Sequence, residues 1–178
     1  MKKLIINDDN LAVQEIDFYE IRVKCFVVND ENKIMLASTR DGCYQLPGGH
    51  VEESEKFNDA VKREILEETG IELNDEEIIK IFYERHILNK NYKNSGKNKQ
   101  TSVIYYLIKT NKKINLNKTN MTQEEKDADY SIDLLSLETM EEKLIDNLNN
   151  NPVEIFRIVS EETLNALCEF KRLKLLKI

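Results

Sequence analysis

The sequence predicts an α+β fold: a mixed β-sheet with helices on both of its faces. Three observations support this class. A strand hairpin opens the chain, an acidic amphipathic helix bounded by Ser54 and Gly70 follows it, and further strands lead to amphipathic helices near the C-terminus. Other α+β arrangements share this order of elements, so the pattern alone leaves the architecture open.

The first half of the chain alternates between short apolar runs and clusters of turn residues. Apolar runs of this length predict strands, and the Asn- and Asp-rich clusters between them predict turns. In chain order we expect an edge strand, a core strand, a turn, a second strand and a loop at residues 4–6, 21–28, 29–32, 33–37 and 38–44. The two longer strands then form a hairpin that enters the core.

The acidic helix carries an apolar stripe. At about 100° per residue, Phe57, Val61 and Ile65 fall on one side of it. Ser54 is a suitable N-cap, and Gly70 is a suitable residue to end the helix in the left-handed conformation. We therefore expect a helix that is bounded by local chemistry and buries its apolar stripe.

Three glutamates, Glu64, Glu67 and Glu68, lie on or beside that stripe. Like charges at i,i+3 and i,i+4 repel one another, and burial adds a desolvation cost. A cation would offset both effects, and Mg²⁺ prefers a few carboxylates together with water and substrate phosphates. The alternative is a solvated charged face, which is what most glutamate-rich helices form.

The second half of the chain predicts more strands separated by polar loops. In order we expect a long strand, a loop, a buried strand, a loop and a last strand at residues 76–88, 89–99, 102–108, 110–122 and 130–136. Strict alternation would place Ile79, Ile81, Tyr83 and Ile87 on one face of the long strand.

Two helices are expected after the last strand. Apolar residues recur at helical spacing at Leu137, Met140, Leu144 and Leu148. Residues 149–152 break this helix, and Ser160 is expected to cap a final one. We treat residues 1–178 as a single domain, with a C-terminal helical extension over about residues 150–178.

Residues 47–49 are a Pro-Gly-Gly stretch that predicts a turn, called the glycine turn below. The glycine turn and the acidic helix together resemble the signature box of the Nudix hydrolase family. The positions of that pattern are occupied, without departure, by Gly49, Glu55, Arg63, Glu64, Ile65, Glu67, Glu68, Gly70 and Ile71. At ordinary residue frequencies a chance match is on the order of 10⁻⁸ per start point. The resemblance implies the Nudix fold, an α/β/α sandwich, which agrees with the predicted order of elements.

The resemblance also implies a metal site. The carbonyl of Gly48 and the carboxylates of Glu64, Glu67 and Glu68 are the expected ligands. The expected ion is Mg²⁺, for which Mn²⁺ can substitute. Glu64 is expected to act either as a ligand or as the general base, and these two roles remain open.

Further residues are expected to support this site. Arg63 is expected to pair with Glu55 and to orient the loop against the helix, with a plain surface position as the alternative. Gly49 and Gly70 are expected to support the box structurally.

Family members often recruit one more acidic residue from a later loop. Glu125 is the expected catalytic residue here, with Glu124 as the near alternative, because this pair precedes the last strand. A solvated turn residue is the competing interpretation of either side chain.

Composition limits the partners and the compartment. The net charge of −7 argues against general nucleic-acid or membrane-surface binding, but not against a nucleotide substrate, because a bound metal reverses the local field. Cys25, Cys43 and Cys168 are odd in number and far apart, which indicates free thiols in a reducing compartment. No apolar run is long enough to span a bilayer, and we expect a cytoplasmic protein. A homodimer is left open.

These features predict a Mg²⁺-dependent Nudix pyrophosphohydrolase. It would cleave the phosphoanhydride of a nucleoside diphosphate linked to another moiety, by attack of water on phosphorus. A nucleoside triphosphate, an oxidised nucleotide and a nucleotide sugar all remain candidates; the proline beyond the box that would favour ADP-ribose is missing. The alternatives are a nucleotide-binding Nudix sensor without catalysis, or an RNA 5′-end pyrophosphohydrolase, which the lack of a basic stripe disfavours.

Overall fold

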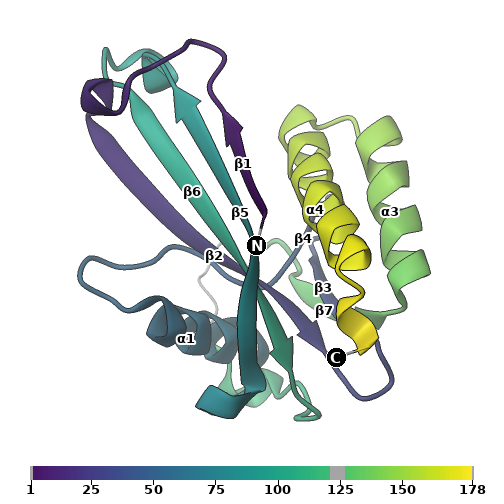
Figure 1. Cartoon of the computed structure of the whole chain (residues 1–178). Coiled ribbons are helices and arrows are strands. Elements are labelled where there is room, and N and C mark those ends of the chain that lie inside the picture. The colour runs from purple at the N-terminus through teal and green to yellow at the C-terminus, as the bar shows by residue number, and fades with distance from the viewer. Residues whose placement is uncertain (1, 121–126, 178) are drawn as a thin grey trace.

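The structure is a computed structural model that describes residues 2–120 and 127–177. Its centre is a mixed sheet in the order β1-β5-β6-β2-β3-β4, with β7 paired to β3. Helix α1 (Phe57–Thr69) lies on one face, and α3 (Leu137–Asn150) and α4 (Glu154–Arg172) lie on the other (Figure 1). The predicted α+β class, with helices on both faces of a mixed sheet, is confirmed.

The predicted strands appear in the predicted order, and the structure adds one short strand, Tyr44–Gln45, which begins in the predicted loop 38–44. The strands are β1 (Lys2–Ile6), β2 (Phe18–Val28), β3 (Ile34–Ser38), β4 (Tyr44–Gln45), β5 (Ile78–Asn89), β6 (Lys99–Lys109) and β7 (Ser131–Leu135). Short 3-10 helices occupy Val13–Glu15, Asp75–Glu77, Tyr92–Asn94, Leu116–Lys118 and Leu175–Lys177. The pairs β1–β5 and β2–β6 are parallel, and the other strand pairs are antiparallel.

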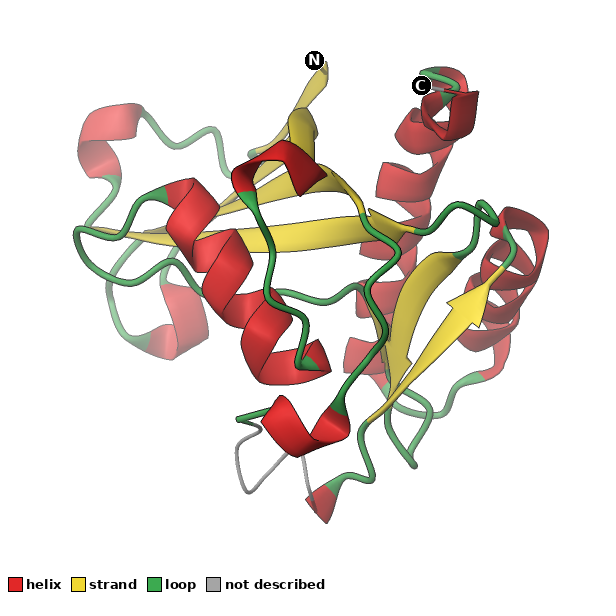
Figure 2. Cartoon of the chain, turned by 90° about the horizontal axis from the view of Figure 1, so that it is seen from below, coloured by secondary structure: helices red, strands yellow, loops and turns green. Residues whose placement is uncertain are grey.

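The sheet separates two apolar clusters because successive strand side chains point to opposite faces. On the α1 side, Val23 and Cys25 of β2 pack with Val61 of α1. On the other side, Phe26 of β2 stacks on Phe170 of α4, with 4.8 Å between the ring centroids. Figure 2 shows the helices on both sides of the strands. The C-terminal helix therefore belongs to the core of the domain.

The alternation expected along β5 is wrong. Its pairing with β6 shifts register between Ile78 and Lys80 and again between Ile81 and Tyr83. Ile81 packs against the apolar cluster on the α1 side of the sheet (the α1 cluster), whereas Tyr83 belongs to the cluster on the opposite side (the α4 cluster). Ile79 is 38% exposed. A bulge inserts a residue into one strand, so the side chains after it change face.

The start of α1 also differs from the prediction. The helix begins at Phe57 after Lys56, and no side chain caps it. Ser54 has φ 65° and lies in a turn in which the Glu55 N–H donates to the Glu52 carbonyl. Because this turn precedes the helix, Phe57 is the first residue of α1, and it is 38% exposed. The other end agrees with the prediction, because Gly70 ends α1 in the left-handed conformation with φ 69°.

Helix α4 begins earlier than the sequence indicated. It starts at Glu154, directly after the break that contains Pro152, so Ser160 lies inside the helix and is fully buried. The Ser160 hydroxyl donates to Asn147 Oδ1 of α3 at 2.9 Å. Asn147 in turn donates to the Gly42 carbonyl at 2.6 Å. The serine therefore joins the two C-terminal helices instead of capping one of them.

Candidate active site

The glycine turn is held along the edge of β2. The Val23 N–H donates to the Gly49 carbonyl and the Cys25 N–H donates to the Pro47 carbonyl, each at 2.9 Å. Gly48 has φ 124°, and a Cβ there would lie 2.3 Å from the Val23 carbonyl oxygen. A side chain is excluded at Gly48 by both its backbone conformation and this close approach.

The neighbouring glycine brings the turn close to α1. A Cβ at Gly49 would lie 2.6 Å from one carboxylate oxygen of Glu64 and 2.7 Å from the other. The missing side chain thus leaves room for the Glu64 carboxylate against the backbone of the turn.

The turn and α1 line a shared cavity of about 310 Å³. All four expected metal ligands, Gly48, Glu64, Glu67 and Glu68, line it. Gly49 and Arg63 line it as well, whereas the helix-ending glycine does not. The structure therefore brings the expected ligands together at one cavity.

Arg63 connects the parts of the box through hydrogen bonds. Its Nε and Nη2 donate to the two carboxylate oxygens of Glu55, both at 2.9 Å, and Nη2 also donates to the His50 carbonyl at 2.8 Å. Its Nη1 donates to Glu64 Oε1 at 2.7 Å and to Glu67 Oε2 at 3.3 Å. One guanidinium thus connects the glycine turn, the loop before α1 and two carboxylates of the helix.

Glu68 is the most deeply placed carboxylate of the cavity, with 7% of its surface exposed. Its Oε2 accepts hydrogen bonds from the Tyr130 hydroxyl at 2.6 Å and from the Gly48 N–H at 3.3 Å. Burial raises the pKa of Glu68 to about 7, against the opposing effect of the Lys24 ammonium. Burial also raises the pKa of Glu64, against the effect of Arg63. A further positive charge nearby would stabilise the ionised form of both carboxylates.

This donor set fits a hard divalent cation. Buried carboxylates beside a backbone carbonyl are the oxygen ligands that Mg²⁺ and Mn²⁺ prefer. Within residues 2–120 and 127–177, however, no three acidic, histidine or cysteine side chains converge closely enough to hold a metal as they stand. Arg63 is the cation that pairs with two of these carboxylates in this structure, because its Nη1 donates to both Glu64 and Glu67.

The cavity includes residues that the sequence analysis did not single out as site residues. They are Arg22, Lys24, Gln45, His50, Glu52 and Asn120. A signal for two of them exists in the sequence, since Arg22 and Lys24 alternate along the strand that becomes apolar at Phe26. Tyr130 carried no such signal, because its contact with Glu68 joins segments 62 residues apart.

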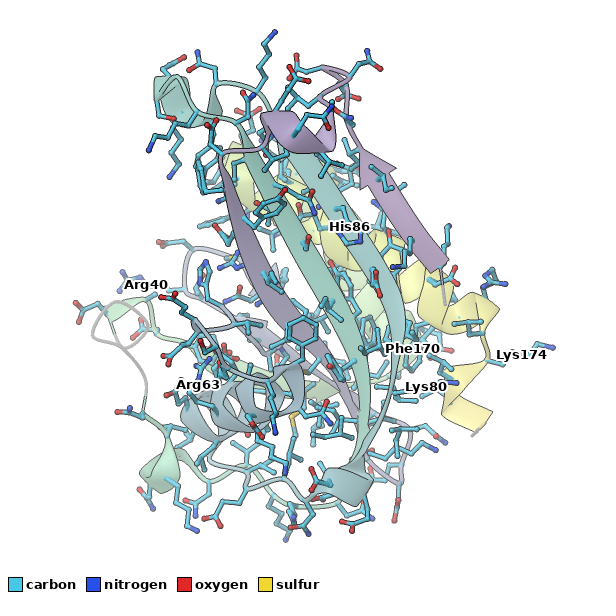
Figure 3. The ribbon with its side chains drawn as sticks, turned by 60° about the vertical axis from the view of Figure 1, so that its left-hand side comes forward. Arg40, Arg63, Lys80, His86, Phe170 and Lys174 are labelled. Atoms are coloured by element: carbon cyan, nitrogen blue, oxygen red, sulfur yellow. The ribbon has the colours of Figure 1, made fainter. Side chains whose placement is uncertain are left out.

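Two further side chains that could contact a base or a phosphate, Tyr83 and Arg40, do not line the cavity. Glu124 and Glu125, the expected late acidic residues, fall outside the described residues. Tyr83 is buried in the core, and Arg40 is exposed and pairs with Asp129. Figure 3 shows Arg40 apart from Arg63, which belongs to α1.

Comparison with known proteins identifies the family. A model of the NUDIX domain matches residues 18–156. An ADP-ribose pyrophosphatase of Methanocaldococcus jannaschii is 45% identical over 49 residues, which cover 25% of this chain and 29% of that protein.

Two solved structures share the fold. The solution structure of the E. coli ORF135 protein has a TM-score of 0.55 at 19% identity, over 88% of this chain and 94% of that one. The MutT protein from Methanosarcina mazei Go1 has a TM-score of 0.51 at 19% identity, over 85% and 95% of the two chains.

Proposed function

The chain belongs to the Nudix family, and from this premise we propose that it is a divalent-cation-dependent pyrophosphohydrolase acting on a nucleoside diphosphate joined to another group. The observation that carries the proposal is the cavity beside α1, where the complete box presents its carboxylates and the Gly48 carbonyl to one space. A phosphoanhydride carries several negative oxygens, so its hydrolysis requires charge neutralisation, an oriented water and a base.

The proposed ligands are the Gly48 carbonyl and the carboxylates of Glu67 and Glu68, with Glu64 as a fourth ligand or as the base. When bound, Mg²⁺ or Mn²⁺ neutralises phosphate charge and lowers the pKa of water. Hydrogen bonds from neighbouring residues already orient one of these ligands. Tyr130 and the Gly48 N–H fix one oxygen of Glu68, so its carboxylate needs little reordering.

The reaction we propose is attack of water on phosphorus. A new O–P bond forms, the bridging P–O bond breaks, and the leaving phosphate keeps the electron pair. The water proton passes to a carboxylate, for which Glu64 is the proposed acceptor because it is buried at the cavity wall against Gly49. Arg63 holds the turn and helix in register through its bonds to Glu55 and the His50 carbonyl.

ADP-ribose is the first substrate to test, because the relative from M. jannaschii is named for it. The box contacts only the diphosphate and the metal in this proposal, so the rest of the substrate is selected by other residues. A nucleoside triphosphate, an oxidised nucleotide and a nucleotide sugar therefore belong in the same test. We also propose a cytoplasmic location, since Cys25, Cys43 and Cys168 are all free thiols.

Incubation with Mg²⁺ and this panel, followed by measurement of released nucleoside monophosphate, phosphate and pyrophosphate, tests the function. We expect turnover of at least one compound, and loss of that turnover in Glu68→Gln. Glu72→Gln is the matched control, because Glu72 follows α1 but is exposed and lies outside the cavity. Nucleotide binding without turnover would favour a sensor, and turnover of only triphosphate-capped RNA would favour an RNA 5′-end pyrophosphohydrolase.

A further inference from the structure

Lys24 reaches into the candidate metal site from β2. Its Nζ donates to the Gly48 carbonyl at 2.6 Å, to the Leu46 carbonyl at 2.9 Å and to Gln45 Oε1 at 3.4 Å. An ammonium has three N–H donors, and the structure supplies an acceptor for each of them. The side chain is therefore held as a cation against the same carbonyl that is the proposed metal ligand.

The backbone fixes the place of this cation. Lys24 lies between Val23 and Cys25, both fully buried, whose N–H groups hold the glycine turn. The strand and the turn thus move together, and only the flexible side chain can change its contacts. Burial lowers the pKa of Lys24, and the Glu68 carboxylate opposes this by favouring the ammonium, which in turn partly compensates the buried carboxylate.

We propose that Lys24 is an internal cation that occupies the Gly48 carbonyl in the metal-free protein and releases it when a divalent ion binds. This inference rests on the proposed function, because it assumes that the ion uses the Gly48 oxygen. The ammonium and the ion would lie within a few ångströms of each other across one oxygen, and like charges at that distance repel strongly.

Release requires only a small change. The Leu46 carbonyl and Gln45 Oε1 remain as acceptors, so the ammonium keeps two of its three partners. The freed N–H lies at a cavity where a phosphate would sit under the proposed function, and an ammonium binds phosphate oxygens well. Lys24 would thereby bind the Gly48 carbonyl in the metal-free protein and a phosphate of the substrate in the metal-bound protein.

Titration of Mn²⁺ into nucleotide-free protein, followed by electron paramagnetic resonance, tests the inference without using activity. The variants are Lys24→Met, which removes the charge, and Lys24→Arg, which keeps it. Lys80→Met is the matched control, because Lys80 is exposed on β5 and outside the cavity lining (Figure 3).

We expect Lys24→Met to bind Mn²⁺ about tenfold or more tightly than the wild type, because a competing cation is removed. Lys24→Arg and Lys80→Met should bind within about threefold of the wild type. Equal or weaker binding by Lys24→Met would overturn the inference while leaving the proposed function intact. Absence of Mn²⁺ binding by the wild type would overturn both.

A second measurement covers a Lys24→Met chain that fails to fold. Crystal structures of the wild type with and without Mn²⁺ should differ in one distance, from Lys24 Nζ to the Gly48 carbonyl. It is 2.6 Å here and should exceed the hydrogen-bond limit of about 3.5 Å when the ion is bound. An unchanged distance with the ion on the Gly48 oxygen would refute the displacement.

Discussion

Arg63→Gln is expected to weaken both the fold and the activity. The substitution removes a bidentate pair with Glu55 and a bond to the His50 carbonyl, and it leaves three carboxylates without their shared counter-charge. The Arg63 side chain is 26% exposed and that of Glu55 is 15% exposed, so solvent screens these contacts only in part.

A bidentate, partly buried pair and one further charged hydrogen bond together contribute about 3 kcal/mol. The free energy of unfolding should fall by that amount, and for a chain of this size Tm should fall by roughly 6–12 °C. Urea unfolding in the presence of a chelator measures the change without metal.

Arg40→Gln is the matched control for this experiment. Arg40 also pairs with a carboxylate, that of Asp129, but its side chain is 64% exposed and the contact is 3.3 Å long. Exposed pairs contribute little, so this variant should lose less than about 0.5 kcal/mol. A loss in Arg63→Gln no larger than that of Arg40→Gln would refute the role of Arg63 as the tie between turn and helix.

Three further predictions concern stability. Gly70→Ala should lower the free energy of unfolding, measured in urea, by about 2–4 kcal/mol, because φ is +69° and the new carbon would lie 2.0 Å from a backbone oxygen. Gly96→Ala has a similar φ but open space, and should cost only about 1 kcal/mol; equal losses would contradict the steric argument. Phe170→Ala should cost about 3–5 kcal/mol, since its ring is fully buried in the α4 cluster; a near-neutral result would mean that the C-terminal helix is not part of the core. Hydrogen bonds from Arg172 hold the pKa of Glu169 below its ordinary value of 4.5. The ionised Glu169 therefore stabilises the fold at pH values above 4.5, and this stabilisation is lost as the pH falls through the pKa of Glu169 in the folded protein. The stability gap between wild type and Glu169→Gln should therefore be largest at neutral pH and close in acid, and a gap that widens in acid would refute this.

The candidate site was predictable where it depends on local geometry. The spacing of Glu64, Glu67 and Glu68 fixes their common direction on a helix, because helical periodicity is a property of the nearby chain. The helix ending at Gly70 was predictable for the same reason. The cavity was not, since it requires β2 to lie beside the glycine turn.

The remaining site residues come from long-range contacts. Lys24 reaches the turn through a pairing between segments more than twenty residues apart, and Tyr130 reaches Glu68 from beyond β6. No local rule indicates such partners from one sequence. The alternating charges of β2 were visible, but only the sheet order shows which face they occupy.

The errors in the fold prediction have similar causes. Ser54 has the chemistry of an N-cap, yet a tight turn places it in the left-handed region before the helix begins. Ser160 has the same chemistry, and its hydroxyl instead bonds to a side chain of the preceding helix. In β5, a bulge that depends on the neighbouring strand overrides the alternation. At Ser160 and in β5 a tertiary contact outweighs the local preference, whereas at Ser54 one local preference, the turn, outweighs another.

Divalent-ion affinity tests the central claim most directly. Mn²⁺ titrated into the wild type, Glu68→Gln and Glu72→Gln should show binding to the wild type and to Glu72→Gln, and binding weakened by at least about tenfold in Glu68→Gln. Equal affinity in all three proteins, or no binding in any of them, would contradict a catalytic ion held by the carboxylates of α1.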